Sequence, residues 1–301
     1  MTPPAVSIIV CSRNRAESLR RVLEALVTER AGRDDVEILA VNNASTDDTR
    51  GVAGQMAART PGLRYLEEPR QGKAFALNTG LQSAKGDLLF FTDDDVTIAA
   101  GWLAALRECF RDGTCEGAAG RILPAFEGGV PAWLPERFPF PFRYDYGTEP
   151  SDAPAPAFGA NMAYRRRAFE KHGTFREDLG PSSGNPFGLG EDSEFCGRLL
   201  KAGERVRYVP GAVVHHPVTR EQASKRFLRG WHVRLGRALA RREPVSAETP
   251  RIFGAPRYLF RTLLESSLGW LFAVSQTRRL SRCLELCRTW GAILEFRAGR
   301  P

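Results

Sequence analysis

The first hundred residues alternate between short apolar runs and longer segments with apolar residues at helical spacing. The apolar runs lie at residues 6–10, 36–41, 63–66 and 88–91. Between them, apolar residues recur every three or four positions, as they do along the buried face of a helix. This alternation constrains the fold because right-handed crossovers through helices join parallel strands into one sheet covered on its faces. We therefore predict an α/β fold with a mostly parallel sheet.

Start and stop signals place the helices between these runs. Asn14 is a suitable N-cap, and Glu17 stands three residues later, as in a capping box. Residues 45–47, with the sequence Ser-Thr-Asp, predict the start of a second helix. A third helix is expected from about residue 72 to residue 86, and a later one from residue 190 to residue 203. These helices cover the predicted strands.

Three consecutive carboxylates, Asp93, Asp94 and Asp95, follow the fourth apolar run directly. A buried strand should not end in three uncompensated charges, because repulsion and desolvation both penalise them. A hard divalent cation resolves this conflict, and α/β sheets bind ligands at the carboxyl ends of their strands. A solvated acidic turn is the alternative interpretation. Residues 11–15 and 42–45 are expected at the same edge, which favours a ligand site.

Two common nucleotide-binding motifs are absent from the sequence. No GxGxxG follows the first strand, and Gly72-Lys73 is not a P-loop because Ala74 follows the lysine. A nucleotide site must therefore be built differently.

Residues 124–158 interrupt the alternating pattern. Eight prolines lie in this segment, interleaved with aromatic residues that include Trp133, Phe138, Phe140, Phe142, Tyr144 and Tyr146. Long irregular segments inside a compact chain are usually functional loops. We expect an ordered loop that shapes a substrate pocket, with a proline-rich spacer as the alternative.

The motifs, taken in order, resemble the inverting glycosyltransferases of family 2, which have the GT-A fold. They are VSIIVCSRNR, VNNASTDDT, RQGKAFALNTG, FTDDDV, FGANMAYRR, GEDSEF and YVPGAVVHH, between Val6 and His216. The resemblance implies a Rossmann-like mixed sheet, mostly parallel and flanked by helices. It also implies a divalent cation, Mn²⁺ or Mg²⁺, that holds the diphosphate of a nucleotide sugar.

The resemblance assigns roles to individual residues. Asp192 matches the catalytic base. Asp95 and Asp93 match metal ligands, and His215 matches a histidine that completes the metal shell, with His216 as a substitute. The donor-binding positions are Ser12, Arg15, Asn43, Arg70, Lys73, Asn78, Asp93, Asp94 and Asn161.

Plainer interpretations exist for several of these residues. Asp192 and Glu191 would also suit the first turn of a helix, where carboxylates favour the dipole. Lys73 alone would be a surface lysine, and the two histidines could be a core or edge pair. Asn43 departs from the family pattern, since many relatives have an aspartate there, and this weakens the expectation of a uridine nucleotide.

The positive charge is concentrated in the last part of the chain. Residues 218–301 hold 17 Lys+Arg and 6 Asp+Glu, a balance of +11, and because the whole chain is +8, the remainder is −3. Phe227, Trp231, Leu235 and Leu239 recur every four residues with arginines between them. Basic amphipathic helices with aromatic residues suit an anionic membrane interface. Packing on the catalytic domain or on a second subunit is the alternative, and nucleic acid fits poorly because no binding module is present.

The sequence thus predicts a GT-A catalytic domain at residues 1–217 and a helical basic extension at residues 218–301. Within the first, residues 1–100 form the nucleotide-binding half and residues 101–217 the acceptor half. The expected reaction is inverting, metal-assisted transfer of a sugar from a nucleotide-sugar donor to a hydroxyl acceptor. A nucleotidyltransferase and an inactive nucleotide-sugar-binding or scaffold protein are the alternatives.

The cellular setting is predicted from the same features. We read no signal peptide in residues 1–10, and six cysteines without CxxC spacing indicate a reduced protein. A cytoplasmic enzyme, peripheral to the inner membrane, is expected. Its acceptor would be an envelope glycan or a lipid-linked precursor, and the C-terminal helices could also join subunits.

Overall fold

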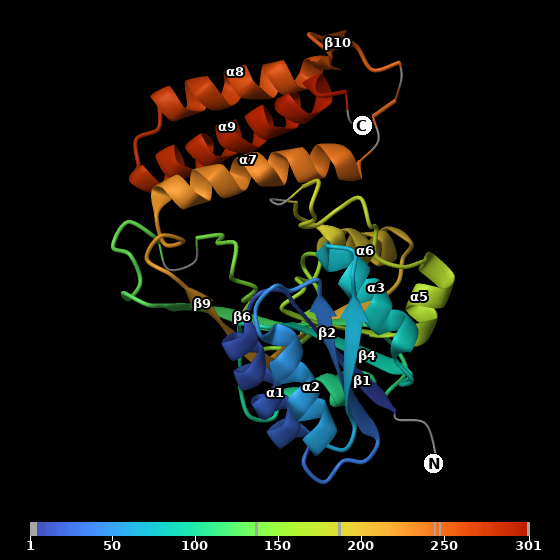
Figure 1. The fold of residues 1–301 in the computed structure, drawn as a ribbon. Coiled ribbons are helices and arrows are strands. Elements are labelled where there is room, and N and C mark those ends of the chain that lie inside the picture. Colours follow the sequence, from blue (N-terminus) through green and yellow to red (C-terminus); the bar gives the residue numbers. More distant parts are fainter. Residues whose placement is uncertain (1–4, 136–137, 186–187, 244, 247, 300–301) are drawn as a thin grey trace. The chain divides into compact units, whose positions relative to one another are not determined.

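The computed structural model describes residues 5–135, 138–185, 188–243, 245–246 and 248–299 (Figure 1). The chain divides into two compact units. Unit 1 comprises Met1–Ala125, Phe142–Gly184 and Glu191–Pro217. Unit 2 comprises Phe126–Pro141, Asn185–Gly190 and Val218–Pro301. The last segment of unit 2 begins where the basic extension was expected to begin, but two earlier segments also belong to this unit.

Unit 1 is built on one mixed sheet with the strand order β3-β2-β1-β4-β8-β6-β9-β5, and β7 pairs with β9. Its strands are β1 (Val6–Ser12), β2 (Val36–Asn43), β3 (Leu63–Glu68), β4 (Leu88–Asp93), β5 (Thr97–Ile98), β6 (Gly117–Phe126), β7 (Ser151–Asp152), β8 (Asn161–Arg165) and β9 (Val206–Val218). The first four strands are parallel. Strand β8 is antiparallel to β4 and to β6, and β5 is antiparallel to β9. The predicted α/β mixed sheet is confirmed.

The parallel strands lie in the core because helices cover both faces of the sheet. Every residue of β2 is buried, and Ile8, Ile9 and Val10 of β1 are fully buried. This burial on both faces explains why these strands are continuous apolar runs rather than alternating ones.

The helices of unit 1 lie between the strands, as the sequence pattern indicated. They are α1 (Ala16–Arg30), α2 (Thr49–Arg59), α3 (Lys73–Ser83), α4 (Trp102–Cys109), α5 (Arg166–His172) and α6 (Glu191–Lys201). Helices α1 and α2 pack together, and α3 contacts β1 and β2 (Figure 1). The connection through α3 runs along the sheet in the opposite direction to those through α1 and α2. A right-handed crossover therefore places α3 on the other face.

The start of α1 and the end of α3 differ from the predictions. Helix α1 begins at Ala16 with Arg15 as its N-cap, and neither Asn14 nor Glu17 forms the predicted capping box. Asn14 instead has a positive φ of 55°, and its side-chain oxygen accepts from the Thr46 N–H. Helix α3 ends at Ser83, before Gly86. A Cβ at residue 86 would lie 2.6 Å from the Ser7 backbone nitrogen, so close approach to β1 requires this glycine.

Part of the loop at residues 124–158 belongs to unit 1, and residues 136–137 lie outside the described part of the chain. Within unit 1, Tyr144 is buried and exchanges backbone hydrogen bonds with Ile122. Tyr144 also contacts the rings of Tyr146, Phe158 and Tyr208. This part of the segment is therefore packed on the sheet, as an ordered loop should be.

Unit 2 contains α7 (Lys225–Arg242), α8 (Arg257–Leu271), α9 (Gln276–Arg297) and a small hairpin of β10 (Arg251–Ile252) and β11 (Ala255–Pro256). Helix α9 packs against both α7 and α8 (Figure 1). Gly236 and Gly291 allow α7 and α9 to approach closely, since a Cβ on either would clash with backbone of the other helix. Glu295 is buried in this unit and forms an ion pair with Arg241.

Candidate active site

The candidate site lies at the carboxyl ends of the parallel strands. Strand β1 has β2 on one side and β4 on the other, so strand order reverses there, and ligands bind at such a switch point. In the register of β1 and β4, Cys11 is opposite Asp93. Ser12 and the three carboxylates that follow Thr92 therefore meet at one edge of the sheet.

Asp94 anchors this edge. The Ser12 hydroxyl donates to Asp94 Oδ2 at 2.6 Å, and Arg15 Nη1 donates to Asp94 Oδ1 at 3.0 Å. The side chain is buried, and burial raises its pKa to about 6, although Arg15 and Ser12 act in the opposite direction. Ser12 and Arg15 are thus brought to the predicted site. Asp94 holds the loop in place rather than facing outward.

Asp93, Asp95 and His216 form a cluster that could hold a metal ion. One ligand atom from each of the three lies within 4.8 Å of the others. Asp95 Oδ2 accepts from Arg15, whereas Asp95 Oδ1 is buried and has no hydrogen-bond partner among the described residues. A buried carboxylate oxygen without a donor is costly unless a cation lies beside it. The residues present therefore fit a divalent cation.

The structure places His216, and not His215, beside these carboxylates. Thr97 of β5 pairs with His215 of β9. Successive side chains on a strand point to opposite faces, and His216 Nε2 lies 3.8 Å from Asp95 Oδ1. The expectation that His215 completes the metal shell therefore differs from the observed geometry, in which the substitute, His216, lies beside the carboxylates.

Two contacts orient the imidazole of His216. Its Nδ1 lies 2.9 Å from the carbonyl oxygen of Pro217, which can only accept, so Nδ1 carries the proton. With the proton on Nδ1, Nε2 is the nitrogen available to a metal ion beside Asp95. The ring of Phe142 stacks on His216 with centroids 4.5 Å apart. Phe142 is a residue of the aromatic loop that sequence reasoning did not select.

Lys73 links the carboxylate cluster to the start of α6. Its ammonium lies 2.7 Å from Asp93 Oδ1 and 3.9 Å from Glu191 Oε1. Burial opposes the charge on Lys73, but the surrounding carboxylates, Asp93 first among them, raise its pKa above the usual value. The pKa of Asp93 is lowered despite burial, because Lys73 stabilises its charged form.

Asp192 lies near Lys73, because Gly159 is close to both side chains. Its Oδ2 accepts from the Gly159 N–H at 2.5 Å, and its Oδ1 accepts from the Ser193 N–H at 2.6 Å. A Cβ at residue 159 would lie 3.1 Å from Asp192 Oδ2 and 3.2 Å from Lys73 Nζ. The glycine thus permits two partly exposed side chains, the Asp192 carboxylate and the Lys73 ammonium, to approach the same backbone.

Glu191, beside Asp192, has a different environment. Its side chain is buried, and burial followed by the charge of Asp192 raises its pKa to about 7. Glu191 is therefore buried, whereas the neighbouring Asp192 is partly exposed.

Three asparagines that were predicted to bind the donor instead form hydrogen bonds within the protein. Asn161 is fully buried, and its amide bonds the Trp102 indole and the carbonyl oxygens of Arg121 and Ala212. Its position does not support the expected contact with a donor. Gly159, two residues earlier in the same motif, is the group that reaches the site.

Asn43 and Asn78 are also buried and engaged. Asn43 donates to the Arg70 carbonyl oxygen at 2.7 Å and accepts from the Gly72 N–H at 2.8 Å. Asn78 bonds both backbone groups of Phe175. These hydrogen bonds hold the loops around the site. Arg70, also a predicted donor-binding residue, is exposed, pairs with Glu68 and lies over the Phe75 ring.

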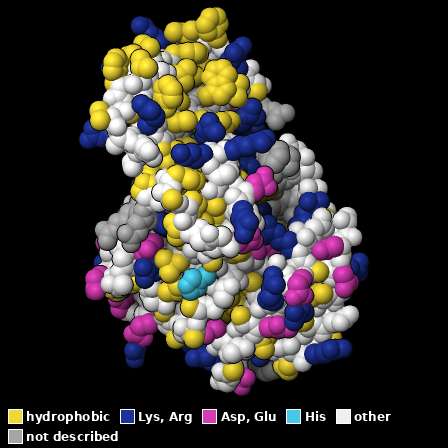
Figure 2. Space-filling view, turned by 90° about the vertical axis from the view of Figure 1, so that its left-hand side faces the viewer, with side chains coloured by type: hydrophobic (Ala, Val, Ile, Leu, Met, Phe, Trp, Pro, Cys, Tyr) yellow, Lys and Arg dark blue, Asp and Glu magenta, His cyan; other side chains and the backbone are white. Residues whose placement is uncertain are grey.

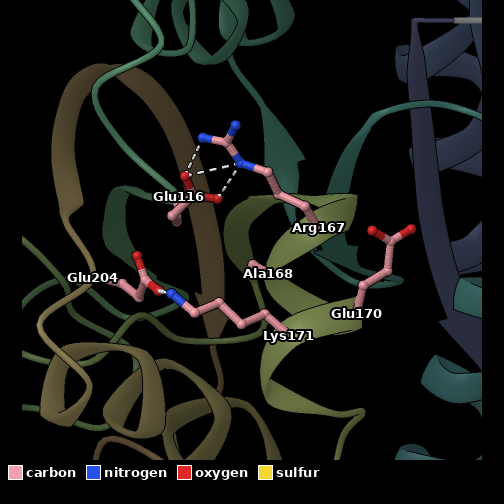
Figure 3. Close-up of a pocket in the computed structure, with 6 residues that line it drawn as sticks. All are labelled: Glu116, Arg167, Ala168, Glu170, Lys171 and Glu204. Atoms are coloured by element: carbon pink, nitrogen blue, oxygen red, sulfur yellow. Dashed lines mark hydrogen bonds and ion pairs between the residues drawn. The ribbon is translucent and has the colours of Figure 1, made fainter.

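A separate hollow of about 530 Å³ lies on unit 1 (Figure 3). It is lined by Glu116, Arg167, Ala168, Glu170, Lys171 and Glu204. Arg167 pairs with Glu116, and Lys171 Nζ lies 2.6 Å from Glu204 Oε1 (Figure 3). Helix α5 follows Arg165, which pairs with Leu88 at the amino end of β4. The hollow is thus at the edge opposite to Asp93, and its ion pairs leave little charge for a substrate.

A mixed sheet with a carboxylate–histidine cluster at its switch point, next to a lysine and a backbone-held aspartate, is the arrangement of a GT-A glycosyltransferase. The chain belongs to glycosyl transferase family 2, whose family model matches residues 7–173. A second model, glycosyl transferase family group 2, matches residues 93–294.

Individual relatives agree with this assignment. The chain is 31% identical over 222 residues to the pre-mycofactocin glycosyltransferase of Mycobacterium tuberculosis, covering 70% of this chain and 42% of that protein. It is 27% identical over 248 residues to the succinoglycan biosynthesis protein ExoM of Rhizobium meliloti, covering 78% of this chain and 74% of that protein. The chain thus spans less than half the length of the mycobacterial relative.

A solved structure has the same fold. It is the mannosyltransferase PcManGT from Pyrobaculum calidifontis in complex with GDP-Man and Mn²⁺. The TM-score is 0.64 at 19% identity, over 98% of this chain and 88% of that chain. The GT-A fold expected from the sequence is therefore confirmed.

Proposed function

We propose that the chain transfers a sugar from a nucleotide-sugar donor to a hydroxyl group of an acceptor, with inversion at the anomeric carbon. One observation carries this proposal. Lys73 pairs with Asp93 of the Asp93–Asp95–His216 cluster, and a Cβ at residue 159 would lie 3.2 Å from the Lys73 ammonium and 3.1 Å from Asp192, so a cation-binding group and a partly exposed carboxylate lie near one ammonium. Inverting transfer needs these two functions, stabilisation of a diphosphate leaving group and a base on the opposite face of the sugar.

The residues at the sheet edge would hold the donor. Asp93, Asp95 and His216 would bind a divalent cation, which when bound supplies positive charge next to the diphosphate. Arg15 and Lys73 present two further positive charges at the same place. They would exchange their present carboxylate partners for phosphate oxygens, as charge-assisted hydrogen bonds allow.

Asp192 would act as the general base. Two backbone N–H groups bind both carboxylate oxygens, which keeps the group oriented. The proton of the acceptor hydroxyl would pass to one of these oxygens as the oxygen of the acceptor attacks. General-base assistance is typically worth about 10²–10⁴ in rate.

We further propose an envelope glycan or a lipid-linked sugar as the acceptor, and a location at the inner face of the inner membrane. The match to a succinoglycan biosynthesis protein supports a glycan product, and the basic extension supports an anionic surface nearby. Among the described helices, none has the length and apolar character needed to cross a bilayer. Any attachment through these helices would be peripheral.

A thermal-shift screen of nucleotide sugars, with and without Mn²⁺ or Mg²⁺, tests the donor proposal. Binding to the folded state alone raises stability, so the correct donor should raise the Tm only when the cation is present. Asp95→Asn should abolish that increase, while Asp34→Asn, an exposed site outside the cluster, should keep it. A full shift in excess chelator would refute the cation-dependent site.

A further inference from the structure

The exposed apolar side chains of unit 2 gather on one helix and the turn that follows it. Of the twelve large hydrophobic side chains that are exposed among the described residues, seven lie on α8 and the turn after it, between Tyr258 and Val274. Figure 2 shows yellow side chains crowded over the helical part of the molecule, with Lys and Arg side chains beside them. Contiguous apolar patches of this kind mark interaction sites rather than ordinary surface.

The outer face of α8 is an apolar stripe. We define it by Leu264, Leu268 and Leu271, which stand at helical spacing and are 62%, 48% and 62% exposed. The inner side of the same helix already buries Leu259 and Ser266. A surface helix normally turns polar residues to water on its outer side. Helix α8 is therefore apolar on a face that its own unit does not cover.

The turn between α8 and α9 extends this stripe. Phe272 and Val274 are 75% and 96% exposed. Together with the stripe they form what we call the α8 surface. An aromatic ring and a branched side chain at a tight turn present apolar atoms with little backbone around them, which suits shallow insertion.

Positive charge surrounds the α8 surface. Residues 251–282 contain six arginines and one acidic residue, Glu265. Arg257 and Arg261 lie on α8 itself, and Arg261 is 82% exposed although it pairs with Glu265. Arginine near an anionic leaflet adds on the order of 1 kcal/mol of binding per residue.

We propose that the α8 surface docks on an anionic membrane, with its leucines and the Phe272 and Val274 side chains at the headgroup–acyl boundary and the arginines on lipid phosphates. The biological role of this docking rests on the proposed function, because docking would hold the active site near a membrane-bound acceptor. A second copy of the chain is a poorer occupant. A two-fold symmetric contact through α8 would oppose two identical helices, each with Arg257 and Arg261 against the single acidic residue Glu265.

This surface replaces the one expected from the sequence. The predicted face of α7 contained Phe227, Trp231 and Leu235, and each of them is only partly exposed. Helix α7 packs against α9 through the Gly236 and Gly291 contact. The side of unit 2 that offers apolar atoms to a membrane is therefore α8.

Vesicle sedimentation of the full chain tests the proposal. Vesicles with 30% phosphatidylglycerol in phosphatidylcholine should bind the protein at low salt and much less at high salt, and pure phosphatidylcholine should bind weakly. Leu264→Gln, Leu268→Gln and Leu271→Gln together should weaken partitioning at least tenfold while keeping the helix, because glutamine is a good helix former. Val130→Gln, an exposed apolar site elsewhere in unit 2, should have little effect.

A second pair of variants tests the charge. Arg257→Gln with Arg261→Gln should weaken binding by about 25-fold, since each arginine accounts for about a fivefold change. Arg21→Gln with Arg50→Gln removes the same charge from unit 1 and should leave binding nearly unchanged.

Three results would overturn the docking proposal: no binding at low salt, wild-type binding by the triple variant, or a dimer that the triple variant abolishes without any vesicle binding. Donor binding in the thermal-shift screen is measured without vesicles. Failure of docking and failure of the proposed sugar transfer are thus separable.

Discussion

Asp192 is held by two backbone N–H groups, and this contact defines its chemistry at the residue scale. Asn has nearly the same shape but cannot accept a proton as a carboxylate does. We therefore predict that Asp192→Asn keeps donor affinity and lowers kcat by about 10² or more. Steady-state kinetics combined with calorimetric titration of the donor measures both quantities.

Glu191→Gln is the matched control for this substitution. Glu191 is buried and its pKa is raised to about 7, so it is already poorly suited to face the acceptor. An unchanged kcat in Asp192→Asn, or an equal loss in Glu191→Gln at unchanged stability, would place the base elsewhere.

The two histidines of β9 offer a second test at this scale. His216 faces Asp95, and His215 pairs with Thr97 on the β5 side. His216→Ala should therefore weaken Mn²⁺ binding at least tenfold, a loss typical for a metal site that loses an oriented contact. His215→Ala should leave the affinity within about twofold. Calorimetric titration with Mn²⁺ distinguishes the two, and the reverse order would contradict the assigned cluster.

At the element scale, the antiparallel pairing of β5 with β9 is what completes the site. Thr97 stands two residues after Asp95, so pairing it with His215 brings His216 to the carboxylates. The sequence predicted the parallel strands and the aspartates at their ends because apolar periodicity and charge are local signals. It could not predict this register, since the pairing joins residues more than a hundred positions apart. The choice between His215 and His216 therefore needed the structure.

The start of α1 shows a second limit of local signals. Asn14 and Glu17 match a capping box, yet Asn14 is engaged with Thr46 and the helix starts later. The tertiary contact outweighs a local preference that is worth about 1 kcal/mol. As a consequence, Arg15 lies at the N-cap and reaches Asp94 and Asp95. Similarly, Asn161 is fully buried in a motif that the resemblance had placed at the donor.

Helix α7 carries a partly buried histidine, His232, with a predictable effect on stability. Burial, followed by the charge of Arg288, lowers the pKa of His232 from 6.5 to about 4. Between these values the unfolded chain binds a proton that the folded chain does not. The free energy of unfolding should therefore fall as the pH drops from about 6.5 to about 4, and should not depend on this group above pH 7.

Urea denaturation of the wild type and of His232→Gln across pH 4–8 measures this contribution. The difference between the two proteins should grow in favour of the variant as the pH falls below 6.5. A constant difference across the range would show that His232 titrates normally in the folded protein.

At the scale of the whole molecule, chemistry and positive charge occupy different parts of the chain. The candidate ligands and the candidate base belong to unit 1, while residues 218–301 carry +11 against −3 for the rest. The periodicity of the C-terminal segment predicted helices and their basic character. It did not predict which face stays exposed, because the leucines of α8 have the spacing of a core face and lie on the outside. Packing of α7 and α8 on α9 decides this, and that contact is not local.

The stereochemistry of donor hydrolysis tests the central claim most directly. With the donor found by thermal shift and with Mn²⁺ present, water can act as the acceptor, and early ¹H NMR spectra report the anomer of the released sugar before mutarotation. A single displacement assisted by Asp192 predicts an anomeric configuration opposite to that of the donor, and no release in excess chelator. Release of the sugar with the donor's own configuration, or equal release without any cation, would contradict the account.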